Sequence, residues 1–173
     1  QHRKELANIY KRLEGNINEN SLFLYSGPIS NQGKWNLDML FYGRYCLNKL
    51  NYLYNWHYPY DITSKPGCVY CGDGNLYNVK IADVFKRFKD MVGTIQIPHH
   101  GSSRNTDVGQ IGDGMICPIC FGTNNKYGHP SYNLISQLLA KWCVPIAVTE
   151  DQHTGFIEII KRILSDSDNK CVS

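Results

Sequence analysis

The chain of 173 residues is long enough to bury one hydrophobic core, and its 42% hydrophobic and 19% charged residues are ordinary for a globular protein. No apolar run approaches the roughly 20 residues that span a bilayer, so we expect no transmembrane helix within this sequence and no membrane contact by this piece. The net charge of +3 is too small to indicate nucleic-acid binding by itself. We therefore expect one domain, or a large part of one.

Seven cysteines are an odd number, which argues against a secreted disulfide framework and favours a reducing compartment such as the cytoplasm. Two pairs, Cys68/Cys71 and Cys117/Cys120, have the spacing of zinc knuckles. Both pairs lie in apolar runs, and residues i and i+3 of a strand face opposite sides of a sheet. We interpret these cysteines as small buried hydrophobic residues, with a structural zinc as the alternative.

The first third of the chain predicts a helix, a short strand and an aromatic-rich segment. Residues 2–14 carry apolar side chains at helical spacing, closed by Gly15, and residues 21–25 predict a buried strand. From about 30 to 66 the chain is rich in aromatic residues, and its apolar spacing predicts a helix over about 36–53. These aromatic residues either pack the segment against the rest of the domain or stack on a ligand.

The remainder alternates strands and helices. We expect strands at 67–72, 94–97, 115–121, 144–149 and 155–160, helices at 79–91 and 131–142, and a polar loop at 103–113. Strands alternating with helices are typical of an α/β fold.

Three polar motifs fall at predicted strand-to-helix junctions. Asp73 stands between two glycines after the strand 67–72, and residues 98–102 read Pro-His-His-Gly-Ser after the strand 94–97. Residues 127–131 read Tyr-Gly-His-Pro-Ser and open the helix 131–142. A glycine lets the backbone approach a ligand closely, and serine hydroxyls with backbone amides can receive an anion.

In order and context, these motifs resemble the C-terminal half of a metallo-β-lactamase-fold hydrolase of the ComEC-type branch. That domain is attached to bacterial DNA-uptake channels, and its relatives include phosphodiesterases such as phosphorylcholine esterase. The shared pattern is Gly72-Asp73, residues 98–102, residues 127–131 and Thr149 ahead of Gly155, within roughly residues 18–160.

The resemblance implies an α/β fold that is the C-terminal half of an αββα sandwich. This portion would cover residues 1–165, with an aromatic-rich insertion at about 30–66 and a polar tail at 166–173. The main metal motif of the family, His-x-His-x-Asp-His, lies in the N-terminal half of that fold and does not occur in this sequence. We expect the chain to be the second half of a longer protein, completed by the N-terminal half of the same domain.

The same resemblance implies a site for two divalent metal ions, zinc or manganese, that hydrolyses a phosphodiester. Asp73 would bridge the metals, and His99 or His100 would be the terminal ligand from this half. The other histidine would turn toward the phosphate or a supporting group, and the sequence leaves the choice open. Alone, the chain is expected to bind metal weakly or at one site and to hydrolyse little.

Three further residues receive roles from the resemblance. Gly101 and the Ser102 hydroxyl and amide would hold a phosphate oxygen, and His129 would protonate or hydrogen-bond the leaving group or phosphate. The predicted function is therefore a metal-dependent phosphodiesterase or nuclease.

Other interpretations remain open. The chain could be a degenerate module of the same fold that binds or scaffolds without catalysis, or a hydrolase of a small ester, lactone or thioester. Asp73 could only close an Asx turn, His129 could only precede a helix, and Thr149 is more often structural. His57 and His153 are not expected in the site.

Overall fold

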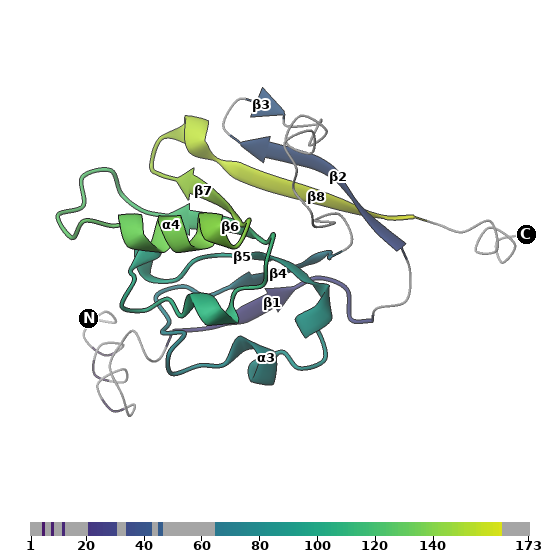
Figure 1. Cartoon of the computed structure of the whole chain (residues 1–173), viewed down its shortest axis with the longest axis horizontal. Coiled ribbons are helices and arrows are strands. Elements are labelled where there is room, and N and C mark those ends of the chain that lie inside the picture. Colours follow the sequence, from purple (N-terminus) through teal and green to yellow (C-terminus); the bar gives the residue numbers. More distant parts are fainter. Residues whose placement is uncertain are drawn as a thin grey trace, which may run out of the picture.

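The computed structural model describes residues 21–30, 34–42, 45–46 and 65–163, together with the isolated residues 5, 8 and 12. Over these ranges the protein has mixed α/β character, with a five-stranded sheet, a three-stranded sheet and few helices (Figure 1). The α/β class expected from the sequence is thus confirmed. No helix in the described ranges is long and apolar enough to cross a membrane.

The five-stranded sheet has the order β1-β4-β5-β6-β7. Its strands are β1 (Leu24–Ser26), β4 (Gly67–Tyr70), β5 (Val92–Ile95), β6 (Ile116–Cys120) and β7 (Val144–Val148). β1 pairs antiparallel with β4, whereas β4, β5, β6 and β7 are parallel. The carboxyl ends of these four strands therefore meet at one edge of the sheet.

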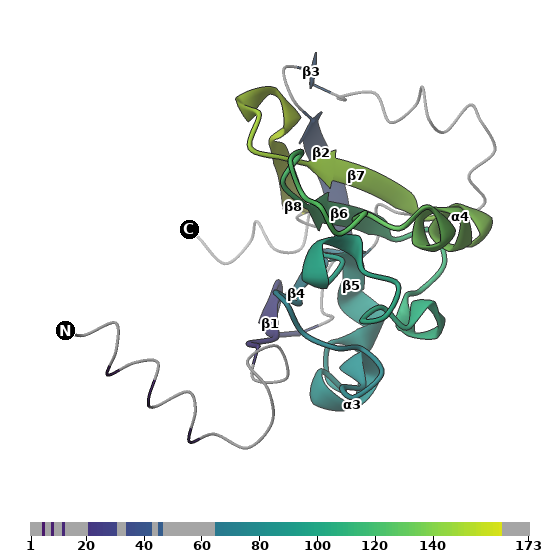
Figure 2. The same ribbon diagram turned by 90° about the vertical axis from the view of Figure 1, so that its left-hand side faces the viewer.

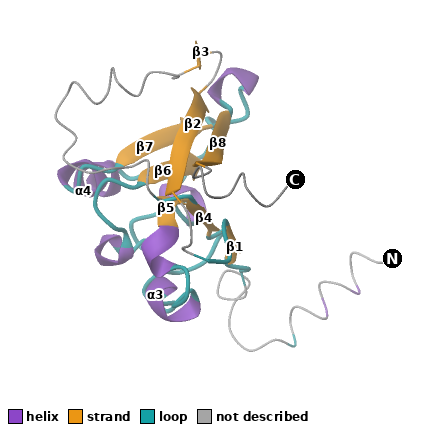
Figure 3. Ribbon diagram, turned by 90° about the vertical axis from the view of Figure 1, so that its right-hand side faces the viewer, coloured by secondary structure: helices purple, strands orange, loops and turns teal. Residues whose placement is uncertain are grey.

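The three-stranded sheet has the order β3-β2-β8 and is antiparallel. Its strands are β2 (Lys34–Tyr42), β3 (Tyr45–Cys46) and β8 (Phe156–Ile163). Seen along the plane of the larger sheet, the helices α3 (Ile81–Val84) and α4 (Tyr132–Ala140) lie on one side and β8 on the other (Figures 2 and 3).

Short 3-10 helices complete the described elements. They are η2 (Lys89–Met91), η3 (His99–Gly101), η4 (Val108–Gln110) and η5 (Gln152–Thr154).

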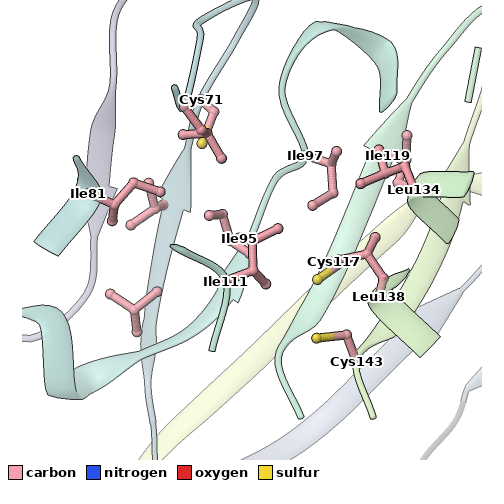
Figure 4. Close-up of a cluster of buried hydrophobic side chains, with 13 residues drawn as sticks. Cys71, Ile81, Ile95, Ile97, Ile111, Cys117, Ile119, Leu134, Leu138 and Cys143 are labelled. Carbon is pink, nitrogen blue, oxygen red and sulfur yellow. The ribbon is translucent and has the colours of Figure 1, made fainter. Parts of the chain in front are cut away.

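The main core lies between the five-stranded sheet and α4. Leu134 and Leu138 of α4 are almost completely buried against side chains from the parallel strands, including Ile95 and Ile119 (Figure 4). These leucines are four residues apart and so share one helix face. A smaller cluster, in which Ile116 and Ile146 are buried and Phe156 is partly buried, lies on the opposite face of the sheet.

The cysteines follow the pleat of the strands. Cys71 and Cys117 are buried in the main core, Cys68 is half-buried and Cys120 is exposed. The interpretation as buried hydrophobic residues is confirmed for Cys71 and Cys117 and is wrong for Cys120. Cys117 and Cys120 are three residues apart in β6, so their side chains face opposite sides of the sheet.

Most predicted elements after residue 66 are confirmed, with shifts at their ends. The strand 115–121 is β6, the helix 131–142 is α4, and the strands 144–149 and 155–160 are β7 and β8. The strand 94–97 lies two residues earlier, as β5. The predicted helix 79–91 is reduced to α3 and the separate turn of η2, and Phe88 stacks on Tyr25 with ring centroids 4.4 Å apart.

Two predictions in the first third are wrong where the structure describes them. Residues 34–42 form β2, not part of a helix, because they pair along β8. The strand near residues 21–25 is not buried, because β1 is an edge strand with Leu24 51% exposed and Leu22 before it 77% exposed. Apart from the isolated residues 5, 8 and 12, the predicted helix 2–14 lies outside the described residues, and so do residues 47–64.

The two sheets are joined by a partly buried polar contact. The Thr94 hydroxyl on β5 donates a 2.8 Å hydrogen bond to Glu158 Oε2 on β8. Glu158 also lines a cavity of about 600 Å³ between β8 and the larger sheet, together with Cys68, Pro118 and Ile160. Burial raises the pKa of the Glu158 carboxyl, although the hydrogen bond from Thr94 partly opposes this.

The Glu158 carboxyl predicts a loss of stability as the pH rises. The pKa of the Glu158 carboxyl is raised in the folded state. Its contribution to the free energy of unfolding is therefore fully present below the ordinary pKa of 4.5 and is lost as the pH rises through the folded-state pKa. Glu158→Gln should remove this decrease, since an amide oxygen still accepts from Thr94 but does not ionise. Urea unfolding midpoints from pH 4 to 8 measure the effect.

The exposed Glu150 provides the control, because its hydrogen bond from Thr123 lowers its pKa. Glu150→Gln should therefore remove a dependence of opposite sign, in which stability is lost as the pH falls. Equal pH profiles for Glu158→Gln and the parent protein would contradict the burial of an ionisable carboxyl between the sheets.

Candidate functional site

Backbone hydrogen bonds hold the ends of β4 and β5 together. The His99 amide donates to the Gly72 carbonyl at 3.0 Å. The Gln96 side-chain oxygen accepts from the amides of Cys71 and Gly72 at 3.2 and 3.3 Å. The segment that carries Asp73 and the segment that carries the two histidines are therefore fixed relative to each other.

The histidine loop has an unusual backbone. His99, His100 and Gly101 have φ angles of 47°, 56° and 82°, all in the left-handed region. The loop is closed by hydrogen bonds from the Gly101 amide to the Pro98 carbonyl and from the Ser102 amide to the His99 carbonyl. Each left-handed residue other than glycine costs about 1–3 kcal/mol and persists only where the surroundings enforce it.

His100 links the ends of three strands. Its Nδ1 lies 2.8 Å from the Cys120 carbonyl at the end of β6, and because a carbonyl only accepts, Nδ1 carries the proton. Its Nε2 lies 3.6 Å from Asp73 Oδ1. In the neutral ring, Nε2 is therefore the nitrogen with a free lone pair, and it lies beside the carboxylate.

His99 and His129 extend this group. The His99 ring lies 6.0 Å from the His100 ring and 6.1 Å from the His129 ring, measured between centroids. His99 Nδ1 is buried and has no hydrogen-bond partner among the described residues. The structure thus gathers Asp73 and the three expected histidines at one edge of the sheet.

His129 is held in place through its backbone. The Asn125 side chain accepts from the His129 amide at 3.1 Å and donates to the His129 carbonyl at 2.8 Å. Burial of the ring, and then the charges of His99, His100 and Arg104, lower the pKa of His129. A lowered pKa favours the neutral imidazole, which can both donate and accept a hydrogen bond.

Gly101 and Ser102 make their hydrogen bonds within the histidine loop. The amides of both residues are used inside the loop, and the Ser102 side chain donates to Asn105 Oδ1 at 3.0 Å. Ser102 is only 3% exposed, and its carbonyl accepts from the Thr106 hydroxyl. These contacts show that both residues shape the loop. Their expected role in holding a phosphate oxygen stays a prediction.

Thr149 and His153 lie in the loop between β7 and β8. The Thr149 hydroxyl contacts the Thr154 hydroxyl at 2.9 Å and accepts from the Asp151 amide, so it has a structural role. His153 Nδ1 lies 2.8 Å from Asp151 Oδ1 within the same turn. His57 lies outside the described residues.

The donor atoms fit part of a metal site. Two ligands about 2.1 Å from a tetrahedral zinc ion are roughly 3.4 Å apart, close to the spacing of Asp73 Oδ1 and His100 Nε2. A carbonyl that fixes the other imidazole nitrogen is the usual support for a metal-binding histidine. However, the described residues contain no group of three or more His, Cys, Asp or Glu side chains arranged to hold a metal.

Two residues near His129 were not singled out from the sequence. The charge of Arg104 acts on His129 from the turn after the histidine loop, and the Tyr127 ring stacks beside His129. The position of Tyr127 within the motif at 127–131 was an available signal. No sequence signal pointed to Arg104, because only the fold brings its loop near His129.

The cavity between the sheets is a separate feature. It is lined by neither Asp73 nor His99, His100 or His129. The polar group therefore occupies the edge of the sheet and not the interior between the sheets.

Comparison with known proteins gives no relative: no family model matches the sequence, and neither a curated protein nor a solved structure matches the chain.

The histidine loop predicts a steric requirement for glycine at position 101. A Cβ at Gly101 would lie 2.7 Å from Pro130 Cβ and 3.0 Å from Ile119 Cγ2, at a φ angle of +82°. Gly101→Ala should lower the free energy of unfolding by about 1–3 kcal/mol, as overpacking in a closely packed site does. Urea unfolding measures the change.

Gly122→Ala is the matched control, because nothing lies within 4 Å of a Cβ added there. This substitution should change the free energy of unfolding by no more than about 0.5 kcal/mol. If both variants unfolded at the same urea concentration as the parent protein, the close contact between the histidine loop and Pro130 would be wrong.

Proposed function

We propose that this chain is part of a metal-dependent phosphodiesterase of the metallo-β-lactamase superfamily, similar to the ComEC-type branch. The observation that carries the proposal is the group formed by Asp73, His100 and the Cys120 carbonyl. A carboxylate beside the free nitrogen of a fixed imidazole is the arrangement expected of two ligands on one cation. The proposed fold is the C-terminal half of an αββα sandwich.

In this proposal, Asp73 and His100 are the metal ligands from this half of the domain. His99 supports them, with its buried Nδ1 available for a partner that the described residues do not supply. The remaining ligands would come from an N-terminal half that carries the His-x-His-x-Asp-His motif. Zinc or manganese bound there would supply Lewis acidity and water of lowered pKa.

His129 has a separate role in the proposal. Its ring adjoins the His99 ring, and within the described part of the chain it makes no hydrogen bond or ion pair with Asp73. It is therefore placed to contact substrate next to the metal ligands. Because its pKa is lowered, the ring is mainly neutral at pH 7. Its N–H would donate a hydrogen bond to the phosphate or to the leaving-group oxygen as negative charge develops there.

A second candidate function is a non-catalytic module of the same fold that binds or scaffolds. It is favoured by the finding that the described residues hold no group of three potential metal ligands. The two candidates differ in the effect expected when the N-terminal half of the domain is added. A catalytic protein should then bind metal tightly and hydrolyse its substrate, whereas a degenerate module should do neither.

The proposal predicts that hydrolysis depends on Asp73. Mutation of a residue that only orients a metal ligand typically lowers metal affinity or activity by about 10- to 100-fold. Loss of a metal ligand itself should have a larger effect. With the N-terminal half of the domain present, Asp73→Ala should lower kcat/KM for a phosphodiester by more than about 100-fold. Hydrolysis of bis(p-nitrophenyl) phosphate with added manganese or zinc measures it, beside calorimetric titration of the metal.

Asp83→Ala is the control, because Asp83 is an exposed carboxylate on α3. It should leave both metal binding and hydrolysis unchanged. An Asp73→Ala variant that cleaved the diester as fast as the parent protein would refute the assigned site. A parent protein that neither bound metal nor cleaved the diester would leave the non-catalytic module as the function.

A further inference from the structure

The cavity between the two sheets has the size of a small-molecule site. Its volume is about 600 Å³, and ligand pockets in proteins typically enclose about 300–1,000 Å³. Phe156 and Ile160 of β8 line it on one side, and Pro118 of β6 and Val148 of β7 line it from the larger sheet. These walls are mainly apolar, so the cavity favours a ligand with an apolar body.

Glu158 places a carboxyl group in this apolar cavity. It alternates along β8 with Ile157 and Ile159, which are exposed, so its side chain faces the larger sheet. One carboxyl oxygen accepts the 2.8 Å hydrogen bond from Thr94, which holds the side chain between the sheets. Within the described ranges, no hydrogen bond reaches the other carboxyl oxygen, which leaves it for a ligand.

No positive charge in the described lining of the cavity compensates this carboxyl. The lining includes no lysine, arginine or histidine among the described residues. Its titratable neighbours on β4 are the Cys68 thiol and the Tyr70 hydroxyl, neither of which can carry a positive charge. Burial raises the pKa of the Cys68 thiol to about 11, and the pKa of Tyr70 is raised by Cys68 and by burial, so both are neutral at pH 7.

The negative charge of Glu158 is therefore unfavourable until a cation arrives. Burial raises the pKa of the Glu158 carboxyl, which means that its ionised form is the one that the surroundings disfavour. A buried carboxylate is stabilised when a cation lies beside it and donates a hydrogen bond. An ammonium group on a ligand would supply both the charge and the donor.

We propose that the cavity between the two sheets binds a small organic amine, whose ammonium group pairs with the Glu158 carboxylate while its apolar body packs against the cavity walls. The aromatic rings of Tyr70 and Phe156 line the same cavity, and such rings also attract a cation. This site is separate from the group of Asp73 and the histidines. It does not depend on the proposed hydrolase function.

Charge distinguishes an amine from the two other classes of ligand that the cavity could enclose. A neutral apolar molecule would fill the space but would leave the Glu158 carboxyl without a charged partner. An anion would meet the carboxylate with no cationic side chain beside it in the described lining. An amine uses both the apolar walls and the carboxyl.

The test compares three probes that share a phenyl group and differ in charge: 2-phenylethylamine, 2-phenylethanol and 3-phenylpropanoate. Binding to the full chain at pH 7, where the amine is protonated, is followed by calorimetry and by the NMR signals of the Tyr70 and Phe156 rings. The amine should bind about 10-fold more tightly than the alcohol, because a hydrogen bond between charged groups contributes at least that factor. The propanoate should bind more weakly than the alcohol.

Glu158→Gln isolates the contribution of the charge. The amide oxygen still accepts from Thr94, so the two sheets should stay joined. Affinity for the amine should fall to that for the alcohol, and affinity for the alcohol should stay the same. Glu150→Gln is the matched control, because Glu150 is exposed and does not line the cavity, and it should leave the binding of all three probes unchanged.

Equal binding of the amine and the alcohol to the parent protein would overturn the amine site and would indicate a cavity for neutral apolar molecules. A Glu158→Gln variant that bound the amine as tightly as the parent protein would also overturn it. The same holds if none of the probes bound, or if the amine bound without shifting the Tyr70 and Phe156 signals. None of these results bears on hydrolysis, which the Asp73→Ala variant tests.

Discussion

The hydrogen bond between the His100 ring and the Cys120 carbonyl is the interaction on which the candidate site depends. It fixes the proton on Nδ1 and so leaves Nε2 facing Asp73. The three partners belong to the ends of three adjacent parallel strands, and a parallel sheet brings such ends to one edge. The placement of the His100 nitrogen beside the Asp73 carboxylate therefore follows from the topology of the sheet and from the tautomer of one imidazole.

The apolar core sets the position of the remaining histidine. α4 is held against the sheet by Leu134 and Leu138, and the Ser131 amide just before this helix donates to the Gly101 carbonyl at 3.0 Å. The histidine loop and the start of α4 are thereby tied together. The packing of α4 on the sheet therefore helps to fix the distance between the rings of His99 and His129.

Much of the second part of the chain could be predicted from local sequence signals. The apolar strands that became β6 and β7 and the helix that became α4 were recognisable because each combines a buried face with a turn residue at its start or end. The convergence of Asp73 with the histidines was also predictable, since each motif follows a strand. These signals are local, and tertiary contacts reinforce them.

The failures have a common physical cause, which is pairing between distant segments. The alternation of apolar residues in 34–42 fits either a helix face or a strand, and only the pairing with β8 decides for the strand. Phe88 has helical spacing from Phe85, yet the segment leaves the helix and Phe88 stacks on Tyr25. The contacts of Arg104 and of the Ser102 hydroxyl could not be predicted for the same reason, because their surroundings are set by the folded loop.

The left-handed backbone at His99 and His100 places backbone stability in conflict with the presence of a side chain at these two positions. Glycine would relieve the unfavourable φ angles, but it would remove the imidazoles that give the edge its chemistry. The protein therefore holds these two imidazoles in a conformation that the rest of the fold must enforce. Because that conformation is reached when the chain folds, the two rings are already preorganised and little rearrangement is left for the moment at which a ligand arrives.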